Sequence, residues 1–457
     1  MERSQSNAAA TNHRVSNSDR SRINVKKSME IMISRSMGES MIKSQDVQRD
    51  REQGFTLAEV MIAAAMSTAI IAAGIGALTV SQKTTQASSQ VGNTQATARN
   101  ALDMIAADIK LAGFGMQGLV GVPPLPAAAT LGAVGNCQIN GAPAAIVPGD
   151  NNALGADFGP DSISLVVPMT NSITAAGALW QVATAGGPAV IGGPTVSIAA
   201  IPLPANATTA MGNAIPGGAA ALAGMAVSIN GAAGSRITGT TPTQINVNPS
   251  ISGQAQFGNG AQVYLVQCIT YEVIPPPDAL NLCQGNAPCL VRGVGVVGAP
   301  NTPPRCNAAG NACIPIMDGV EDLQLAYACD GCDPRVNAGS ADGQVDDLNL
   351  SNSFDQADFI TDRNWFGSAF PYGTNMQPKT IRMVQISIVA RETRTEQGMG
   401  EGNQVMVHGG AVPIVSDHNH ATGVFALGDN TTPAQLQAYQ QFRRRILTRT
   451  VELRNQR

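Results

Sequence analysis

Residues 54–82 read GFTLAEVMIAAAMSTAIIAAGIGALTVSQ, and this stretch decides the fold of the N-terminal part of the chain. After Gly54 it contains a single charged residue, Glu59. About 20 helical residues, rising 1.5 Å each, span the roughly 30 Å hydrocarbon core of a bilayer. The sequence therefore predicts a transmembrane helix over residues 55–80.

The first 54 residues differ in kind from the rest of the chain. They carry ten Lys or Arg and seven acidic residues, whereas the remaining 403 carry 18 basic and 25 acidic residues. Basic residues beside a membrane segment favour a cytoplasmic N-terminus. We therefore expect the large C-terminal part on the opposite side of the inner membrane, in the periplasm.

A cleaved secretory signal and a plain signal anchor each explain only some features of this N-terminus. A cleaved secretory signal has a shorter apolar region that ends at a small-residue site. A plain signal anchor fits the length, but it gives no reason for a carboxylate near the membrane entrance. Such a charge is costly in a bilayer and therefore indicates a function.

Residues 54–59, Gly-Phe-Thr-Leu-Ala-Glu, closely resemble the processing motif of type IV prepilins. The resemblance implies that a membrane prepilin peptidase cuts between Gly54 and Phe55 and that the new N-terminal Phe55 is methylated. It also implies that Glu59 offsets the N-terminal ammonium of a neighbouring subunit, which suits the need to pair charges in a medium of low dielectric constant. The 54-residue leader is longer than such leaders usually are, and Met29, Met32, Met37 and Met41 offer later starts.

The helix is expected to continue beyond the membrane. No Pro occurs from Lys83 to Ala112, and Leu102, Ile105, Ile109 and Ala112 share one helical face. Gly113 is a plausible stop signal. We predict an amphipathic continuation over residues 81–113 that covers a soluble domain, residues 114–457.

That domain reads as β-rich. Runs of β-forming residues occur at 162–167, 195–201, 262–271, 381–391 and 446–453. In the run at 381–391, Val384, Ile386, Ile388 and Ala390 fall on one face. The predicted fold class is α+β: a pilin-like long N-terminal helix packed on an antiparallel β-sheet domain with long Gly/Ala-rich loops.

Four segments, in the right order, are similar to landmarks of PilW-type minor pilins. They are residues 101–114 (ALDMIAADIKLAGF), 318–327 (DGVEDLQLAY), the strand at 381–391, and the terminal run from Arg443 to Asn455. Residues 120–260 resemble nothing comparable, so the resemblance implies no fold there.

The amino-acid composition argues against several classes of protein. Charged residues are 13% and aromatic residues 4% of the chain, and it contains 48 Gly and 27 Pro. These values argue against a charged disordered protein and a coiled coil. A net charge of -4 leaves no basic surplus for nucleic acid, so no nucleic-acid partner is expected. No motif indicates a cofactor or an enzyme.

The eight cysteines all follow the membrane segment: Cys137, Cys268, Cys283, Cys289, Cys306, Cys313, Cys329 and Cys332. An even number in an oxidising compartment favours disulfides. Pairing of sequence neighbours would give 283–289, 306–313 and 329–332. A metal knuckle or a redox motif at 329–332 remains as the alternative, although a zinc ribbon needs a second such pair.

A carboxylate-rich stretch follows the last cysteine and contains Asp330, Asp333, Asp342, Asp346 and Asp347. Oxygen ligands around a Gly turn suit Ca²⁺, which makes Asp342 and Asp346 weak candidates. An EF-type register would place Ala338 and Asn349 at two key ligand positions, and neither residue can fill its position. A solvated polar loop is the simpler interpretation.

The C-terminal arginines, Arg443, Arg444, Arg445, Arg449, Arg454 and Arg457, are most simply a charged sheet edge that resists mispairing. A patch that faces a partner or lipid is the alternative.

These features predict a minor type IV pilin that takes part in pilus assembly or priming, with the prepilin peptidase and other pilins as partners. A place at the pilus tip, in motility or adhesion, is implied by the resemblance alone. The alternatives are a type II secretion pseudopilin, or a membrane-anchored periplasmic enzyme or adhesin with a metal site in the Cys/Asp region.

Overall fold

The fold is described from a computed structural model. It describes residues 55–114, 116, 137–139, 142–149, 160–169, 181–182, 190–192, 198–213, 222–251, 256–274, 282–283, 287–294, 312–333, 335, 339–360, 378–392, 414–415, 418–419 and 442–455. The chain divides into two units, residues 1–78 and 79–457, and the boundary falls inside helix α2.

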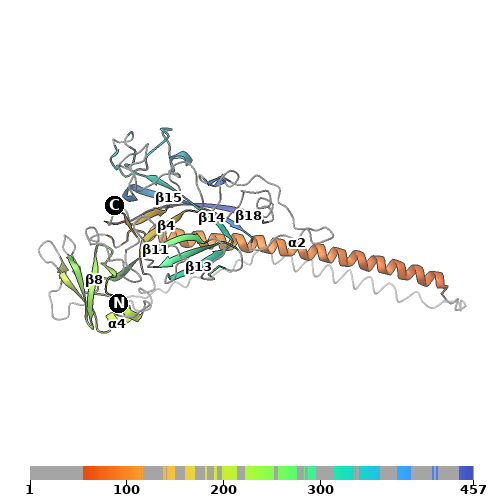
Figure 1. Cartoon of the computed structure of the whole chain (residues 1–457), viewed down its shortest axis with the longest axis horizontal. Helices are drawn as coiled ribbons and strands as arrows, with labels where there is room; N and C mark the ends of the chain where they lie inside the picture. Colours follow the sequence, from red (N-terminus) through yellow and green to blue (C-terminus); the bar gives the residue numbers. More distant parts are fainter. Residues whose placement is uncertain are drawn as a thin grey trace, which may run out of the picture. The chain divides into compact units, whose positions relative to one another are not determined.

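Helix α2 (Leu57–Leu111) is a single element of 55 residues, shown in orange in Figure 1. Its composition is rich in Ala and lacks Pro, which favours an uninterrupted helix. Gly113 follows its end with φ +80°, a conformation that Gly adopts without steric cost. The helix occupies almost the whole predicted range of residues 55–113.

The first part of α2 exposes its apolar side chains on every side. Large hydrophobic residues from Leu57 to Val80 are 44–81% exposed. Among the residues that the structure describes, α2 is the one helix long and apolar enough to cross a membrane. A helix that is hydrophobic all round is stable only when protein or lipid surrounds it.

The last part of α2 is amphipathic and packs on the domain. Its buried face comprises Ala98, Ala101, Leu102, Ile105, Ala106 and Ile109. These residues join one core with apolar side chains of two different sheets, including Leu165 and Ile269 from one and Leu325 and Ile386 from the other. The predicted helix face is therefore the face that is buried.

The smaller of these two sheets is antiparallel, with strand order β14-β15-β18. Its strands are β14 (Val320–Cys329), β15 (Ile381–Arg391) and β18 (Arg444–Glu452). The alternation of apolar residues predicted for 381–391 is confirmed, since Val384, Ile386, Ile388 and Ala390 all lie in the core shared with α2.

The larger sheet has the order β13-β12-β11-β7-β8-β9-β6, and β4 pairs with both β11 and β3. The strands are β3 (Ile146–Gly149), β4 (Ser162–Pro168), β6 (Ile198–Pro202), β7 (Ala226–Ile229), β8 (Ala233–Thr241), β9 (Gln244–Ile251), β11 (Val263–Ile274), β12 (Cys289–Val294) and β13 (Ala312–Asp318). Every pairing in it is antiparallel.

The remaining elements are short. They are the strand pairs β1 (Gln138–Ile139) with β2 (Ala142–Pro143), β5 (Val190–Gly192) with β10 (Gln256–Gly258), and β16 (Ile414–Val415) with β17 (His418–Asn419), the helix α4 (Ala207–Asn213), and the 3-10 turns η4 (Gln356–Asp358) and η6 (Pro378–Thr380). Together with α2, the antiparallel sheets make an α+β architecture, as predicted.

A second core lies away from α2. It is built from residues between Val182 and Leu265, with Ile201, Met211, Val227 and Ile245 fully buried. Strands β4 and β11 pair directly, with Pro168 opposite Val266, so the chain between them is an insertion with its own core. From Ser162 to Tyr271, the sequence has one charged residue, Arg236.

Candidate functional site

The N-terminal end of α2 contains the predicted processing and assembly residues. Gly54 lies outside the described residues, and Phe55 is 86% exposed. Both the amide and the hydroxyl of Thr56 donate to Glu59 Oε2 at 3.0 Å, and the amide of Glu59 donates to Thr56 Oγ1 at 3.3 Å. This reciprocal arrangement is a capping box, which satisfies amides at the helix start. In the isolated chain, Glu59 therefore caps its own helix.

A polar cluster joins the other end of α2 to the larger sheet. Asp108 Oδ2 accepts a hydrogen bond from the Tyr271 hydroxyl at 2.5 Å and one from Arg292 Nε at 3.0 Å. Tyr271 lies on β11 and Arg292 on β12, directly opposite each other. Burial, and next the negative charge of Asp108, raise the pKa of the Tyr271 hydroxyl. Because the three groups satisfy one another, the cluster fixes the rotation of α2 on the sheet.

The C-terminal arginines do not all form a solvated sheet edge, which corrects part of the sequence interpretation. Arg444 donates two hydrogen bonds to the buried carboxylate of Glu321 on β14, and Arg391 on β15 donates a third. Arg449 forms an ion pair with Asp103 of α2. Arg444 and Arg449 therefore connect β18 to β14 and to α2. Arg457 lies outside the described residues.

Three disulfides lie within the described residues. They join Cys137 to Cys268, Cys283 to Cys289, and Cys329 to Cys332. The last two are pairs of sequence neighbours, as the spacing suggests, whereas the first links residues 131 positions apart. Cys313 is also disulfide-bonded, and Cys306 lies outside the described residues.

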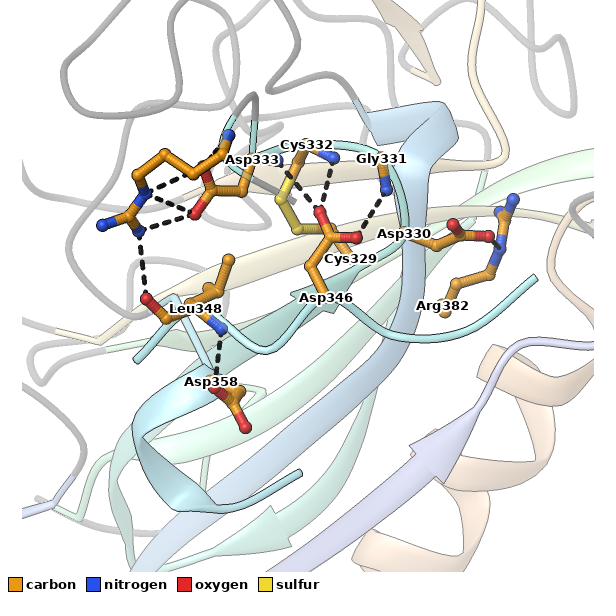
Figure 2. The surroundings of a disulfide bond; sticks show 10 residues. Cys329, Asp330, Gly331, Cys332, Asp333, Asp346, Leu348, Asp358 and Arg382 are labelled. Carbon is orange, nitrogen blue, oxygen red and sulfur yellow. Dashed lines mark hydrogen bonds and ion pairs between the residues drawn. A yellow bond between two sulfur atoms is a disulfide. The ribbon is translucent and has the colours of Figure 1, made fainter. Parts of the chain in front are cut away.

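The turn at residues 329–333 is organised around one buried carboxylate (Figure 2). Asp346 accepts hydrogen bonds from the amides of Gly331, Cys332 and Asp333, at 3.0, 2.9 and 2.9 Å. Gly331 has φ +82°, and a Cβ there would lie 2.6 Å from the amide nitrogen of Ala341. No other residue fits this position without moving the backbone. The sequence Cys-Asp-Gly-Cys therefore closes a turn around Asp346.

Asp330 ties the same turn to its surroundings. Its carboxylate is fully buried and accepts hydrogen bonds from the amides of Asp342 and Gly343, and from Arg382 Nε at 3.1 Å. Arg382 belongs to β15 and is shown to the right of the turn in Figure 2. The loop at 339–343 is thereby connected to the smaller sheet.

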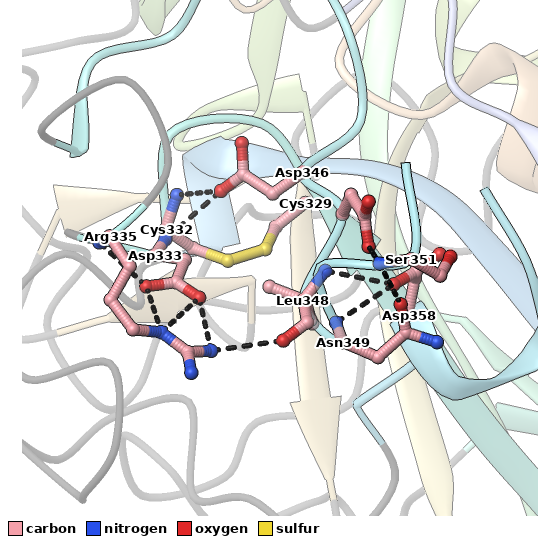
Figure 3. Close-up of polar contacts among 10 residues, drawn as sticks. Cys329, Cys332, Asp333, Arg335, Asp346, Leu348, Asn349, Ser351 and Asp358 are labelled. Atoms are coloured by element: carbon pink, nitrogen blue, oxygen red, sulfur yellow. Dashed lines mark hydrogen bonds and ion pairs between the residues drawn. A yellow bond between two sulfur atoms is a disulfide. The ribbon is translucent and has the colours of Figure 1, made fainter. Parts of the chain in front are cut away.

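In the next part of the loop, buried carboxylates again accept hydrogen bonds from nearby groups of the chain (Figure 3). Arg335 forms a forked ion pair with Asp333 and also donates to the carbonyl of Leu348 at 3.0 Å. Burial alone would raise the pKa of Asp333, but the hydrogen bonds and charge of Arg335 outweigh it and hold the pKa below its ordinary value. Asp358 is fully buried and accepts from the amides of Leu348 and Asp355.

The positions of Asp342 and Asp346 test whether these two residues could bind Ca²⁺ together. Asp342 accepts from the Gln344 amide at 2.9 Å, while Asp346 turns both oxygens toward the Cys-Asp-Gly-Cys turn. Within the described part of the chain, Asp346 groups with Cys329 and Cys332 as possible metal ligands, and Asp342 joins no such group. The structure therefore does not bring Asp342 and Asp346 together as ligands.

The group of Cys329, Cys332 and Asp346 also fits a metal or redox role poorly. Zinc binds cysteine as the thiolate, and these two sulfur atoms are joined in a disulfide. Both cysteines are fully buried, so a thiol from another protein has no access to them. Asp346 already accepts three amide hydrogen bonds. The group acts as a structural clasp.

Comparison with known proteins finds a match to the C-terminal part of the chain. The family model described as PilW, Type IV Pilus-assembly protein W, matches residues 285–455. The matched region contains β12–β18 and the clasp around Asp346. No curated protein and no solved structure matches the chain.

The match supports a PilW-like type IV pilus protein with a role related to pilus assembly. Together with the apolar helix α2, it indicates a protein anchored in a membrane that interacts with other type IV pilus components.

Proposed function

We propose that this chain is a minor type IV pilin that is processed between Gly54 and Phe55, methylated on Phe55, and packed through α2 into a pilus. One observation supports this proposal most strongly. A single helix is apolar and exposed over Leu57–Val80 and then buries a narrow face, Ala98–Ile109, in its own domain. That division suits a subunit that lies in lipid before assembly and against other helices afterwards.

The assembly step follows from the physical chemistry of α2. Lateral packing of such helices replaces lipid contacts with protein contacts, and a carboxylate in that bundle is tolerated only with a cationic partner. Glu59 would exchange its cap on Thr56 for the N-terminal ammonium of a neighbouring subunit. The large domain, residues 114–457, favours a place in a priming or tip complex in motility or adhesion.

A type II secretion pseudopilin remains the alternative, because it shares the processing motif. The family match over residues 285–455 favours the pilus.

The proposal is tested with Glu59→Leu in cells that assemble pili, with Thr68→Val as the matched control. Thr68 is another polar residue on the exposed part of α2, and its hydroxyl donates only to its own helix. We expect Glu59→Leu to be processed and inserted but depleted at least tenfold from sheared pili, because an unpaired ammonium in the bundle costs several kcal/mol. Normal incorporation of Glu59→Leu would count against the proposal.

A further inference from the structure

Strand β18 forms one edge of the smaller sheet, and its open side follows from the register. Leu453 donates to the carbonyl of Arg382, and Glu392 donates to that of Arg443, at 2.8 and 3.0 Å. Hydrogen-bonded pairs alternate along an antiparallel ladder, so the odd-numbered residues of β18 bond to β15. The even-numbered residues, among them Ile446, Thr448 and Thr450, therefore direct their backbone N–H and C=O groups away from the sheet.

This edge carries charged side chains, but it lacks a bulge and a proline, two further features that protect an edge strand against pairing. Its nine residues contain no Pro and no Gly, and they pair with β15 without a register shift. By contrast, the pairing of β14 with β15 shifts twice. Proteins commonly blunt an edge with a bulge, a proline or a short strand. Among the described residues, β18 pairs with β15 and with no other strand.

The side chains along the edge are suited to a partner of a particular kind. Ile446 is 45% exposed, and Thr448 and Thr450 are exposed β-branched residues, which favour strand pairing. Arg445 and Arg454 are exposed near the two ends of the strand, and neither forms an ion pair with a described residue. Strand β18 contains one acidic residue, Glu452, which is also exposed. The edge is regular and partly apolar, with a basic residue, Arg445, near its start and the oppositely charged Glu452 and Arg454 near its end.

We propose that β18 receives an extended acidic segment of another pilus subunit, which adds as a fourth strand beside β14, β15 and β18. Backbone hydrogen bonds to the even-numbered residues supply the affinity, and acidic side chains near Arg445 and Arg454 set the register. This inference rests on the proposed function, because it takes the partner from the assembled pilus.

The first test compares hydrogen exchange of the full-length protein in detergent with exchange in pili sheared from cells. We expect the amides of Ile446, Thr448 and Thr450 to exchange about 100-fold more slowly in pili, because only strand addition gives them acceptors. Equal exchange in both samples overturns the proposal.

The second test is Thr450→Pro, with Thr450→Ala as the matched control. The amide of Thr450 points outward, so proline removes an edge donor and leaves the ladder to β15 complete. We expect both variants to melt like the wild type and to be processed alike, while Thr450→Pro alone falls at least tenfold in sheared pili. Equal incorporation of the two variants overturns the proposal.

These outcomes separate the two proposals. If Phe55 is not the mature N-terminus, the proposed function fails whatever the exchange rates are. If processing is normal and the edge amides stay unprotected in pili, only the strand-addition proposal fails.

Discussion

Asp346 is the residue on which the Cys-Asp-Gly-Cys turn depends. Its buried carboxylate accepts hydrogen bonds from the backbone amides of three buried residues. A carboxylate that accepts amide hydrogen bonds acts as a structural acceptor in the same way as a helix cap. In this loop the acidic residues stabilise a conformation, which explains an acidic sequence without a bound ion.

We predict that Asp346→Asn lowers the free energy of unfolding by about 3 kcal/mol, because an amide NH₂ group faces backbone donors and leaves them unpaired. Asp342→Asn is the control, since Asp342 is exposed, and we expect a loss under about 0.5 kcal/mol. Urea unfolding of the domain measures both values. Similar losses for the two variants would contradict the structural role of Asp346.

Asp333 predicts a specific dependence of stability on pH. Its folded pKa lies below the unfolded value of about 3.9, so its contribution to stability is complete above that pH and is lost as pH falls through the folded pKa. Urea midpoints measured from about pH 5 downward should therefore fall less steeply in Asp333→Asn than in the wild type. Parallel curves would show that Arg335 does not lower the pKa of Asp333.

The acidic loop shows what the sequence could not reveal at this scale. Cys329, Cys332 and the carboxylates were recognisable as a group, and a solvated loop was the simpler expectation. Asp330 and Asp346 are instead buried, as is Asp358 farther along the loop. Their carboxylate oxygens accept hydrogen bonds from backbone amides of residues 10–15 positions away, and such pairs leave no pattern in composition or spacing.

At the scale of elements, the contact between α2 and the larger sheet combines an apolar face with one polar cluster. Asp108 lies next to Ile109 on the buried side of the helix, and it reaches Tyr271 and Arg292 on neighbouring strands. Apolar packing supplies most of the stabilisation, while the hydrogen bonds select one rotation of the helix.

We predict that Tyr271→Phe lowers the free energy of unfolding by about 1–2 kcal/mol, since it removes one hydrogen bond to a largely buried carboxylate. Asp108→Asn should cost more, because Arg292 then loses its ion-pair partner. Asp103→Asn is the matched control on the same helix, where the exposed pair with Arg449 contributes at most about 1 kcal/mol. Equal losses at Asp103 and Asp108 would refute this ranking.

The elements that the sequence predicts best are those with a clear period. The 3.6-residue pattern of α2 and the alternation in β15 both match the buried faces that the structure shows. Within the insertion between β4 and β11, the sequence predicted only the strand run at 195–201. Its core is built mostly from Val, Ile, Leu and Met residues, but they are spread over short strands such as β6 and β7, which are too short to show a clear period. The pairing of β4 with β11 also spans too many residues for local signals to reveal it.

At the scale of the whole molecule, two regions point to the same role by different features. The apolar helix indicates a membrane anchor, and the family match over residues 285–455 supports a pilus-assembly role. The claim that connects them is proteolytic maturation at the border between Gly54 and Phe55. Without that step, the leader would remain attached at the helix end that packs in the assembled pilus.

The N-terminal sequence and mass of the protein recovered from cell envelopes test this claim most directly. We expect the wild-type protein to begin with methylated Phe55. The Gly54→Val variant should instead retain its leader. An N-terminus at Met1, Met41 or any other residue upstream of Phe55 would contradict the account, and the chain would then be a plain signal-anchored protein.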